Sequence, residues 1–317
     1  MAVLTLFLDG VGIGTPDPAV NPLAAARMPE LRALLDGAVP TAAHPAPAGS
    51  RTVVVPLDAT LGVDGLPQSG TGQTAIFTGE NGARLIGKHF GPWPYSTLRP
   101  VIGEKNVLRT LLRHGCSVRF ANVFPQRFFD HLERRPTRAT VTVLSATSSG
   151  VPLLRAEALE AGEGISADIT AEAWPGMGYA GVRPVTPREA GRRLAGLLRT
   201  HDFVLFEYWK TDHAGHSGDF AEAVDALERF DGLLGGVVEG MDPDRDLVLL
   251  CSDHGNVEDM SVKTHTRNPV PLLLHGRRAA EAAAFLGNGA AGQADLTRVT
   301  PLILHLLGAT AGASAVS

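Results

Sequence analysis

Residues 246–256 read DLVLLCSDHGN, an apolar run that ends in an aspartate and a histidine. The uninterrupted apolar stretch 247–251 is typical of a strand buried on both faces of a parallel sheet. Asp253 and His254 then lie at the carboxyl end of that strand, where open α/β sheets bind ligands. His265 follows eleven residues after His254. Because transition metals accept carboxylate and imidazole ligands, the stretch predicts a metal site at a sheet edge.

The same pattern recurs along the chain and predicts the fold class. Helical patterns separate the apolar runs, and their starts carry capping signals at Asn21-Pro22, Thr186-Pro187-Arg188-Glu189 and Asp219. We therefore expect an α/β fold, a mainly parallel sheet with helices on both faces. The predicted strands are residues 3–8, 116–123, 202–208, 246–251 and 270–274.

Length and composition limit the organisation and the partners. A chain of 317 residues can form one large α/β core with a modest insertion. Residues 126–186 have weak periodicity and are predicted to form a small lid or insertion, which leaves a discontinuous core of residues 1–125 and 187–317. The formal net charge of -5, with no basic block, argues against nucleic-acid binding.

The N-terminal apolar run and the two cysteines indicate the cellular location to expect. The apolar run at residues 3–8 is too short for a signal peptide or a membrane span, so no membrane association is expected. Cys116 and Cys251 lie in apolar surroundings, which predicts unpaired core thiols in a reducing compartment. We expect a cytoplasmic protein.

Asp9 ends the first predicted strand and faces the same sheet edge as Asp253. The glycines that follow it, residues 10–14, do not have dinucleotide-loop spacing, and Pro16 prevents a helix from opening there. Nucleotide binding is therefore discounted. Asp9 itself is equally compatible with a turn-capping role and with a metal ligand.

Two further loops carry reactive side chains. Asp212 and His216 are four residues apart, so one helical turn brings both to one face, as in many metal sites. The alternative is a capped helix start with a surface histidine. Ser69 precedes a helix of small residues, where a serine can meet an anion or can serve only as a helix cap.

The four loops together supply three aspartates, three histidines and one serine, enough ligands for two adjacent divalent cations. Two metals roughly 3.5–4 Å apart clamp the attacking and leaving oxygens of an in-line phosphoryl displacement. A serine hydroxyl becomes a strong nucleophile when a metal stabilises its alkoxide. The combination predicts phosphoryl-transfer chemistry.

These motifs, in this order, resemble the alkaline phosphatase superfamily. The resemblance is closest to its cofactor-independent phosphoglycerate mutase and phosphopentomutase branch, and it rests on Asp9-Gly10, residues 69–79, 212–218, 252–256 and 265–271. It implies that Ser69 is the nucleophile and forms a phosphoseryl enzyme. It also implies two ions, Mn or Zn, the first held by Asp212, His216 and His265, the second by Asp9, Asp253, His254 and the Ser69 oxygen.

The chain departs from that branch at two places. Gly72-Gln73 stands where the mutases have Gly-His, and only the loop at about residues 84–102 stands where the phosphoglycerate mutase carries a large second domain. A mutase must exclude water from its phosphoenzyme, which a closing domain does. The sulfatase nucleophile motif is also missing. Hydrolysis of a phosphate monoester is therefore the simpler expectation.

Cationic side chains near these loops are candidates for binding the substrate, because lysine and arginine suit anionic oxygens. Each is equally explained as an ordinary solvated charge. Trp209 and two other aromatic residues, Trp93 and Tyr95, can line a pocket or belong to the core. The cationic candidates are Arg84, Lys88, His89, Arg127 and Lys210.

The leading hypothesis is a two-metal enzyme that hydrolyses a small phosphorylated metabolite through Ser69. The second is a phosphomutase of the phosphoglycerate mutase or phosphopentomutase type. The third is a metal-dependent binding protein that kept the ligands and lost the chemistry, which Gln73 leaves open. The sequence assigns no oligomeric state.

Overall fold

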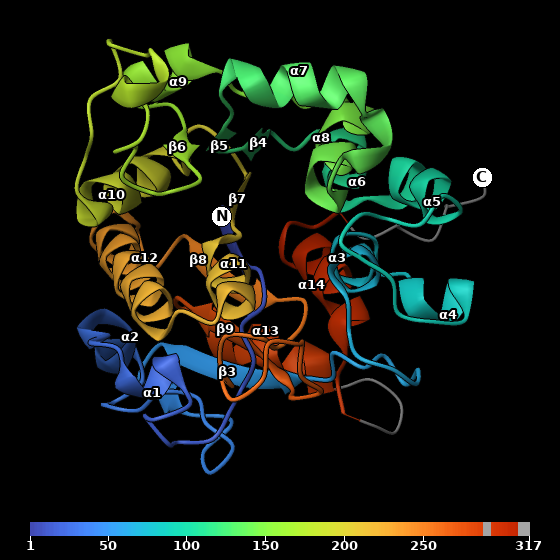
Figure 1. Cartoon of the computed structure of the whole chain (residues 1–317), viewed down its shortest axis with the longest axis vertical. Helices are drawn as coiled ribbons and strands as arrows, with labels where there is room; N and C mark the ends of the chain where they lie inside the picture. The colour runs from blue at the N-terminus through green and yellow to red at the C-terminus, as the bar shows by residue number, and fades with distance from the viewer. Residues whose placement is uncertain (288–292, 310–317) are drawn as a thin grey trace.

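The computed structural model describes residues 1–287 and 293–309, and a seven-stranded sheet organises this part of the chain (Figure 1). The strand order is β2-β3-β9-β8-β1-β7-β4. Its strands are β1 Val3–Leu8, β2 Ala48–Gly49, β3 Thr52–Leu57, β4 Val118–Phe120, β7 Phe203–Tyr208, β8 Leu247–Ser252 and β9 Val270–His275. A separate two-stranded sheet joins β5 Asn122–Val123 to β6 Ile165–Ser166.

Strand direction confirms a mainly parallel sheet. β4, β7, β1 and β8 pair in parallel, whereas β9 is antiparallel to both β8 and β3. β3 therefore runs in the direction of β8, and β2 is antiparallel to β3. Five strands share one direction, and only β2 and β9 oppose them.

Helices cover both faces of the sheet. α10 and α12 lie on one side, and α3 and α14 lie on the other (Figure 1). The helices are α1 Pro22–Ala25, α2 Pro29–Leu34, α3 Ser69–Thr78, α4 Gly82–Ile86, α5 Leu98–Lys105, α6 Val107–Arg113, α7 Gln126–Arg134, α8 Val141–Ser149, α9 Ala156–Glu160, α10 Pro187–Leu197, α11 Lys210–Ser217, α12 Phe220–Gly240, α13 Ala279–Gly287 and α14 Val299–Leu306.

β1 shows why its sequence is apolar throughout. Val3 and Phe7 join the core on the α3 side, whereas Leu4, Leu6 and Leu8 join the core on the α12 side. Successive strand residues point to opposite faces, so a strand covered by helices on both faces needs an apolar residue at nearly every position. This burial fixes the strand whose end carries Asp9.

The capping signals in the sequence are confirmed as helix starts. The Asn21 side chain accepts a hydrogen bond from the Leu23 amide at 2.9 Å, and Thr186 accepts one from Glu189 at 3.1 Å. Asp219 caps α12 by accepting from the amides at the start of that helix. Each cap satisfies backbone donors that a helix start leaves without partners.

Two strand predictions need correction. The predicted strand 116–123 is divided into β4 and β5, which belong to different sheets. β3 was absent from the predicted strands; it contains Pro56, and proline is unusual in a strand interior. In the structure Pro56 lies opposite Pro271 of β9, beyond the residues at which β9 pairs with β8, so both prolines are tolerated.

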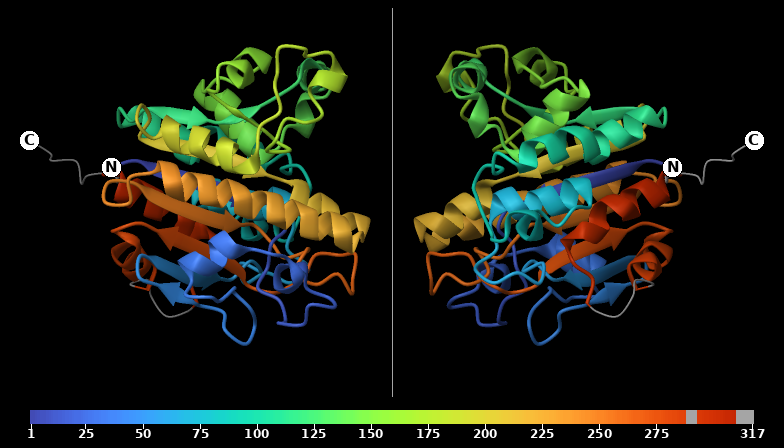
Figure 2. Two further views of the ribbon diagram at one scale, coloured as in Figure 1. Left: turned by 90° about the vertical axis from the view of Figure 1, so that its left-hand side faces the viewer. Right: turned by 90° about the vertical axis from the view of Figure 1, so that its right-hand side faces the viewer.

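The segment predicted as a lid or insertion has two kinds of packing. α8 contributes Val141 and Val143 to the main core on the α3 side. Residues further along, including Leu154, Leu159 and Trp174, form a small cluster of their own. Figure 2 shows these green and yellow-green segments at one end of the molecule. A lid over residues 126–186 stays a prediction.

The described residues contain no helix long and apolar enough to cross a membrane. Cys116, just before β4, and Cys251, within β8, are both free thiols. Burial raises the pKa of Cys251 well above its ordinary value, so this thiol stays protonated within the core.

Candidate active site

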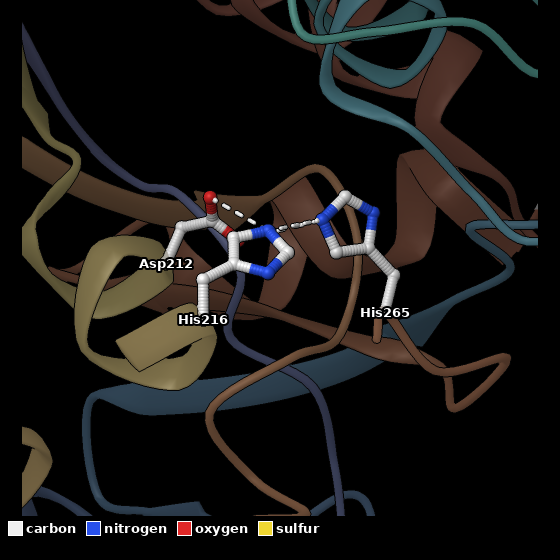
Figure 3. Close-up of side chains that lie close together, drawn as sticks. All are labelled: Asp212, His216 and His265. Atoms are coloured by element: carbon white, nitrogen blue, oxygen red, sulfur yellow. Dashed lines mark hydrogen bonds and ion pairs between the residues drawn. The ribbon is translucent and has the colours of Figure 1, made fainter. Parts of the chain in front are cut away.

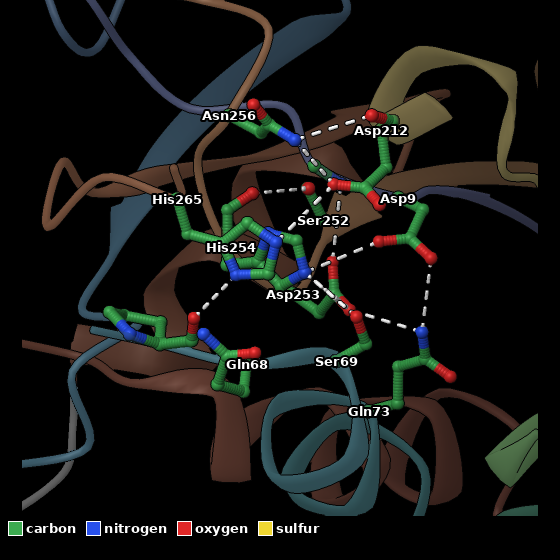
Figure 4. Close-up of polar contacts among 12 residues, drawn as sticks. Asp9, Gln68, Ser69, Gln73, Asp212, Ser252, Asp253, His254, Asn256 and His265 are labelled. Atoms are coloured by element: carbon green, nitrogen blue, oxygen red, sulfur yellow. Dashed lines mark hydrogen bonds and ion pairs between the residues drawn. The ribbon is translucent and has the colours of Figure 1, made fainter. Parts of the chain in front are cut away.

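The predicted functional side chains meet at the carboxyl ends of β1, β7 and β8 (Figure 4). Asp9 directly follows β1, and Asp253 and His254 directly follow β8. The remaining members are Asp212 and His216 of α11, His265 of the loop before β9, and Ser69, the first residue of α3. The parallel strands account for this convergence, because their carboxyl ends share one edge.

Asp212, His216 and His265 form what we call the open group (Figure 3). Nε2 of His216 lies 3.5 Å from Asp212 Oδ2, and Nε2 of His265 lies 3.6 Å from Asp212 Oδ1. The two Nε2 atoms are 3.0 Å apart. One carboxylate group and two imidazole nitrogens therefore point at one small volume.

Backbone carbonyls fix the orientation of both rings in the open group. His265 Nδ1 lies 2.7 Å from the Pro67 carbonyl oxygen, and His216 Nδ1 lies 3.2 Å from the Lys263 carbonyl oxygen. A carbonyl only accepts, so each ring places a proton on Nδ1, and as a neutral imidazole it would present a lone pair at Nε2. Two facing lone pairs repel unless a cation lies between them, so this arrangement fits a metal ion.

Ser69, Asp9, Asp253 and His254 form what we call the buried group (Figure 4). Nε2 of His254 lies 3.0 Å from Ser69 Oγ, 3.4 Å from Asp9 Oδ1 and 3.5 Å from Asp253 Oδ2. Among the described residues, Asp9 Oδ1 and His254 Nδ1 have no hydrogen-bond partner although both are buried. A buried oxygen without a partner is costly, and a cation at Asp9 Oδ1 relieves that cost.

The two groups are neighbours. The rings of His254 and His265 stack with centroids 3.7 Å apart. Ligand atoms of Asp9, Asp212 and His254 lie within 4.8 Å of one another, so Asp212 is close enough to serve either group. The arrangement can accommodate adjacent cations, which is the requirement for two-metal phosphoryl transfer.

Burial sets the electrostatics of the buried group. Desolvation, and next the Asp253 charge, raise the pKa of Asp9 well above its usual range. Desolvation, and next the Asp212 charge, raise the pKa of Asp253 to about 6. Desolvation, and next the charge of His265, lower the pKa of His254 to about 3. Without a cation the site holds carboxylates that resist ionisation and a neutral imidazole.

Gln73 holds the two carboxylates of the buried group together. Its amide nitrogen donates to Asp9 Oδ2 at 3.3 Å and to Asp253 Oδ2 at 3.1 Å (Figure 4). Gln73 lies four residues after Ser69 in α3, so one helical turn places both on the same face. The sequence marked Gln73 only as a departure from the mutase pattern, whereas the structure brings it into contact with two predicted ligands.

The loop after β8 holds Asp212 of the open group in place through hydrogen bonds. Asn256 donates to Asp212 Oδ1 at 2.7 Å, and buried Glu258 accepts from the amides of Gly12 at 3.0 Å and Asn256 at 2.7 Å. A Cβ at Gly12 would collide with the Glu258 carboxyl group. The glycines after β1 therefore allow close backbone approach between Gly12 and Glu258.

Glu207 and Thr142 are site residues that sequence reasoning missed. Thr142 donates to Glu207 Oε2 at 2.6 Å, and desolvation raises the pKa of buried Glu207 to about 7. Glu207 lines a cavity together with Asp9. It lies inside the apolar strand β7, where a single carboxylate has no motif to mark it; the one signal was its charge among buried residues.

The predicted cationic residues divide into two sets. Arg84 and Lys88 are exposed, and the Lys88 ammonium lies over the Tyr95 ring at 5.5 Å. His89 Nε2 lies 3.2 Å from the Val63 carbonyl oxygen. None of these three lines a cavity described below. Arg127 and Lys210 both line the larger cavity, so they are the candidates that the structure brings near the site.

Two cavities adjoin the site. The first, of about 580 Å³, extends from Asp9 and Glu207 to α7 and the segment around Trp174. The second, of about 390 Å³, is lined by Ser69, Gln68 and the open group, with Lys263 and Pro92 at its wall. The buried group thus borders the first cavity through Asp9, and the open group borders the second, so each group has space for a substrate beside it.

Comparison with known proteins finds partial matches in sequence. Residues 180–311 match the Metalloenzyme superfamily model. The 2,3-bisphosphoglycerate-independent phosphoglycerate mutase of Desulforudis audaxviator is 35% identical over 130 residues, 39% of this chain and 24% of that protein. The corresponding enzyme of Colwellia psychrerythraea is 34% identical over 125 residues, 37% of this chain and 22% of that protein. The matches thus span less than a quarter of these relatives.

Solved structures extend the likeness to the whole fold. Alkaline phosphatase from the Antarctic bacterium TAB5 superposes with a TM-score of 0.55 at 10% identity, covering 97% of both chains. Thermus thermophilus alkaline phosphatase superposes with a TM-score of 0.54 at 12% identity, covering 97% of this chain and 91% of that one. At these identities the likeness concerns the fold alone.

The described part of the chain thus has the fold of alkaline phosphatases, and residues 180–311 match a model of metalloenzymes, in agreement with the predicted resemblance. Over about two fifths of its length the chain is similar to phosphoglycerate mutases. The segment that matches the family model carries Asp212, His216, Asp253, His254 and His265.

Proposed function

We propose that the chain hydrolyses a small phosphate monoester through a phosphoseryl intermediate at Ser69. The observation that carries the proposal is the position of the Ser69 hydroxyl, which is buried, begins α3 and lies 3.0 Å from His254 Nε2. The open group lies on the other side of His254, with the His265 ring stacked on it. Ser69 therefore has ligand groups for two cations within reach.

The proposed ligands follow the two groups. Asp212, His216 and His265 hold one divalent ion, and Asp9, Asp253, His254 and the Ser69 oxygen hold the other. Manganese and zinc both suit mixed carboxylate and imidazole ligands. When bound, the two ions supply the positive charge that stabilises the serine alkoxide and the developing charge on the leaving oxygen.

The protein's own residues position the reaction. Ser69 Oγ attacks phosphorus, the bond between phosphorus and the ester oxygen breaks, and the alcohol leaves with a proton. Water then attacks the phosphoserine and releases inorganic phosphate and the free serine. The first turn of α3 directs the positive end of its helix dipole toward the phosphoryl group, and Gln73 keeps the Asp9 and Asp253 carboxylates in place.

Access of water favours hydrolysis over transfer back to the substrate. The His216 side chain is 46% exposed, and the cavity beside Ser69 is lined on one wall by the loop residues Lys263 and Thr264. A phosphoserine at this position is open to solvent from that side. A mutase needs the opposite, a closed site that keeps water from the phosphoenzyme.

A phosphomutase is the second candidate, because the phosphoglycerate mutase of Desulforudis audaxviator is 35% identical to this chain over 130 residues. The two functions differ in one product. A phosphatase releases one inorganic phosphate for each alcohol formed, whereas intramolecular transfer leaves inorganic phosphate near zero.

The experiment is a metal-controlled screen. The metal-free protein is loaded with manganese or with zinc and incubated with small phosphorylated metabolites, including 3-phosphoglycerate and pentose phosphates. Phosphate and alcohol are measured together. We expect equal amounts of both with at least one ester; phosphorylated isomers without phosphate support the mutase, and binding without turnover supports a protein that lost the chemistry.

We also propose a cytoplasmic location, which the free thiols of Cys116 and Cys251 support. The division into a core and a lid at residues 126–186 is likewise proposed, with α8 packed on the core side.

A further inference from the structure

We infer that the larger cavity binds the organic group of the ester, and that this group is apolar and carries an aromatic ring. The inference rests on the proposed function and adds a substrate class to it. The cavity, about 580 Å³ in volume, lies between α7, α8 and the segment of residues 166–177.

The cavity reaches the proposed catalytic residues at Asp9. Asp9, a member of the buried group, and Glu207, its neighbour at the end of β7, both line it. Lys210, two residues before Asp212, lines it from the first turn of α11. Ser69 lines the smaller cavity, whereas Asp9 borders the larger one. A phosphoryl group held between Ser69 and Asp9 therefore has the larger cavity on its Asp9 side as a space for the rest of the molecule.

The walls are mainly apolar. Ten of the eighteen lining residues have apolar or aromatic side chains, so water in the cavity gains few hydrogen bonds from them. Such a surface favours a ligand that displaces this water with carbon atoms. The large side chains among the ten are Phe124, Phe128, Trp174, Met177 and Trp209.

Aromatic walls also favour a flat partner. Phe124 and Phe128 stack on each other with ring centroids 4.2 Å apart. Trp174 is buried, and its indole nitrogen donates to Oγ of Ser166 in β6 at 2.7 Å, so the polar atom of this ring is already satisfied. Rings held in place in this way pack against a ligand ring at little entropic cost.

The charges around the cavity argue against a small sugar acid. Two cationic residues, Arg127 and Lys210, line it, but three carboxylates, Asp9, Asp168 and Glu207, line it as well. The Lys210 ammonium also lies 4.9 Å from the centroid of an aromatic ring in the same wall. A glycerate carboxylate would find no excess of cationic over acidic residues in this cavity and would leave the apolar walls without a partner.

The first experiment compares two substrates with similar leaving alcohols. Propyl phosphate and 3-phenylpropyl phosphate each react with water to give a primary alcohol and inorganic phosphate, so the phenyl ring is the main difference. We expect kcat/KM to be about ten-fold or more higher for the phenyl compound, because a ring buries substantial apolar area. 3-Phosphoglycerate should be the poorest of the three.

The second experiment places the ring in the cavity. Phe128→Ala should lower kcat/KM for 3-phenylpropyl phosphate several-fold more than it lowers the value for propyl phosphate. Phe129→Ala is the matched control, since Phe129 is the next residue of α7, does not line the cavity and packs under the Arg155 guanidinium at 3.6 Å. Inhibition by 3-phenylpropylphosphonate should weaken in the first variant only.

The outcomes separate this inference from the proposed function. Equal kcat/KM for the two alkyl esters, or a higher value for 3-phosphoglycerate, overturns the inference while hydrolysis itself stands. An equal loss on both esters in Phe128→Ala also overturns it, because the loss then does not depend on the ring. Failure of the wild-type protein to hydrolyse any of the three contradicts the proposed function instead.

Discussion

The open group and the buried group use similar ligands in different surroundings. The His216 side chain is 46% exposed, whereas those of His254 and Asp253 are fully buried. In the open group, backbone carbonyls fix the imidazole protons, and these carbonyls carry no charge that titrates. In the buried group, the Gln73 amide bridges two carboxylates whose pKa values are raised by burial.

This difference in burial shows which group is destabilised by its own charges when no metal ion is bound. Burying carboxylates next to one another is unfavourable unless a cation compensates them. The buried group should therefore bind its ion tightly and depend on it for local stability. The open group, reached by solvent and oriented by the main chain, should exchange its ion faster.

Ser69→Ala should give the largest effect, a loss of at least about 10³-fold in kcat, because it removes the proposed nucleophile. Both metal groups keep their carboxylate and imidazole ligands, so two ions per chain should still bind. Steady-state hydrolysis and metal analysis measure the two properties. Ser96→Ala, a change at an exposed serine of the loop before α5, should alter neither. Full activity in Ser69→Ala would rule out the phosphoseryl route.

Asp253→Asn should change both metal binding and stability, with opposite signs. The ion of the buried group should be lost, and hydrolysis with it. In the metal-free protein the pKa of Asp253 is raised from 3.8 to about 6, so ionising this buried carboxyl costs on the order of 3 kcal/mol at neutral pH. Removing the charge should then stabilise the metal-free protein.

The pH dependence of that effect follows from the raised pKa of Asp253. Well below the ordinary pKa of 3.8 the carboxyl group is protonated in both the folded and the unfolded protein, so the wild type carries little penalty. As the pH rises from there through about 6, the wild type loses this stability and the variant does not. The thermal midpoint of Asp253→Asn minus that of the wild type should increase from pH 4 to pH 8 without metal; a constant difference would contradict the account.

His216→Ala should have a smaller effect, confined to the open group. One of the two ions should bind about 10- to 100-fold more weakly, because one of three ligands is gone, while the ion of the buried group stays. Competition with a chelator, followed by counting the ions that remain, measures this. His213→Ala is the control on the same helix, since His213 is exposed and contacts Glu222 instead. Simultaneous loss of both ions would mean that the groups are not separable.

Gln73→Leu should give the smallest of these effects on the ions. Asp9 and Asp253 lose the amide that joins them, so affinity at the buried group should fall about ten-fold, with little change at the open group. Gln73→His, which restores a donor at this position, should recover part of the lost affinity. Isothermal titration with zinc or manganese tests both variants. Equal affinities in Gln73→Leu and the wild type would reduce Gln73 to a packing residue.

Sequence patterns predicted which candidate ligands lie together, because motifs at strand ends are local. Asp9, Asp253 and His254 each follow an apolar run, so one short stretch of sequence predicted both the strand and the reactive residue at its end. Asp212 and His216 were paired by helical spacing. Parallel topology then required these loops to converge on one edge, and the described structure agrees.

The supporting contacts depend on packing between distant segments, and no local pattern reports them. Glu207 lies within an apolar strand, and its partner Thr142 comes from a segment predicted as a lid. Gln73 was visible as a departure, but its bridge to Asp9 and Asp253 exists only once α3 packs across β1 and β8. β3 was absent from the predicted strands, and its internal proline is tolerated through the pairing with β9.

Acid quenching of the metal-loaded protein during turnover tests the central claim most directly. Peptide mass spectrometry should find phosphate on Ser69 at the earliest times, and inorganic phosphate should then appear in amounts equal to the alcohol. Absence of phosphoserine while alcohol accumulates would contradict the proposed nucleophile. Phosphate that remains on an isomerised substrate, with none released, would contradict hydrolysis and identify a mutase.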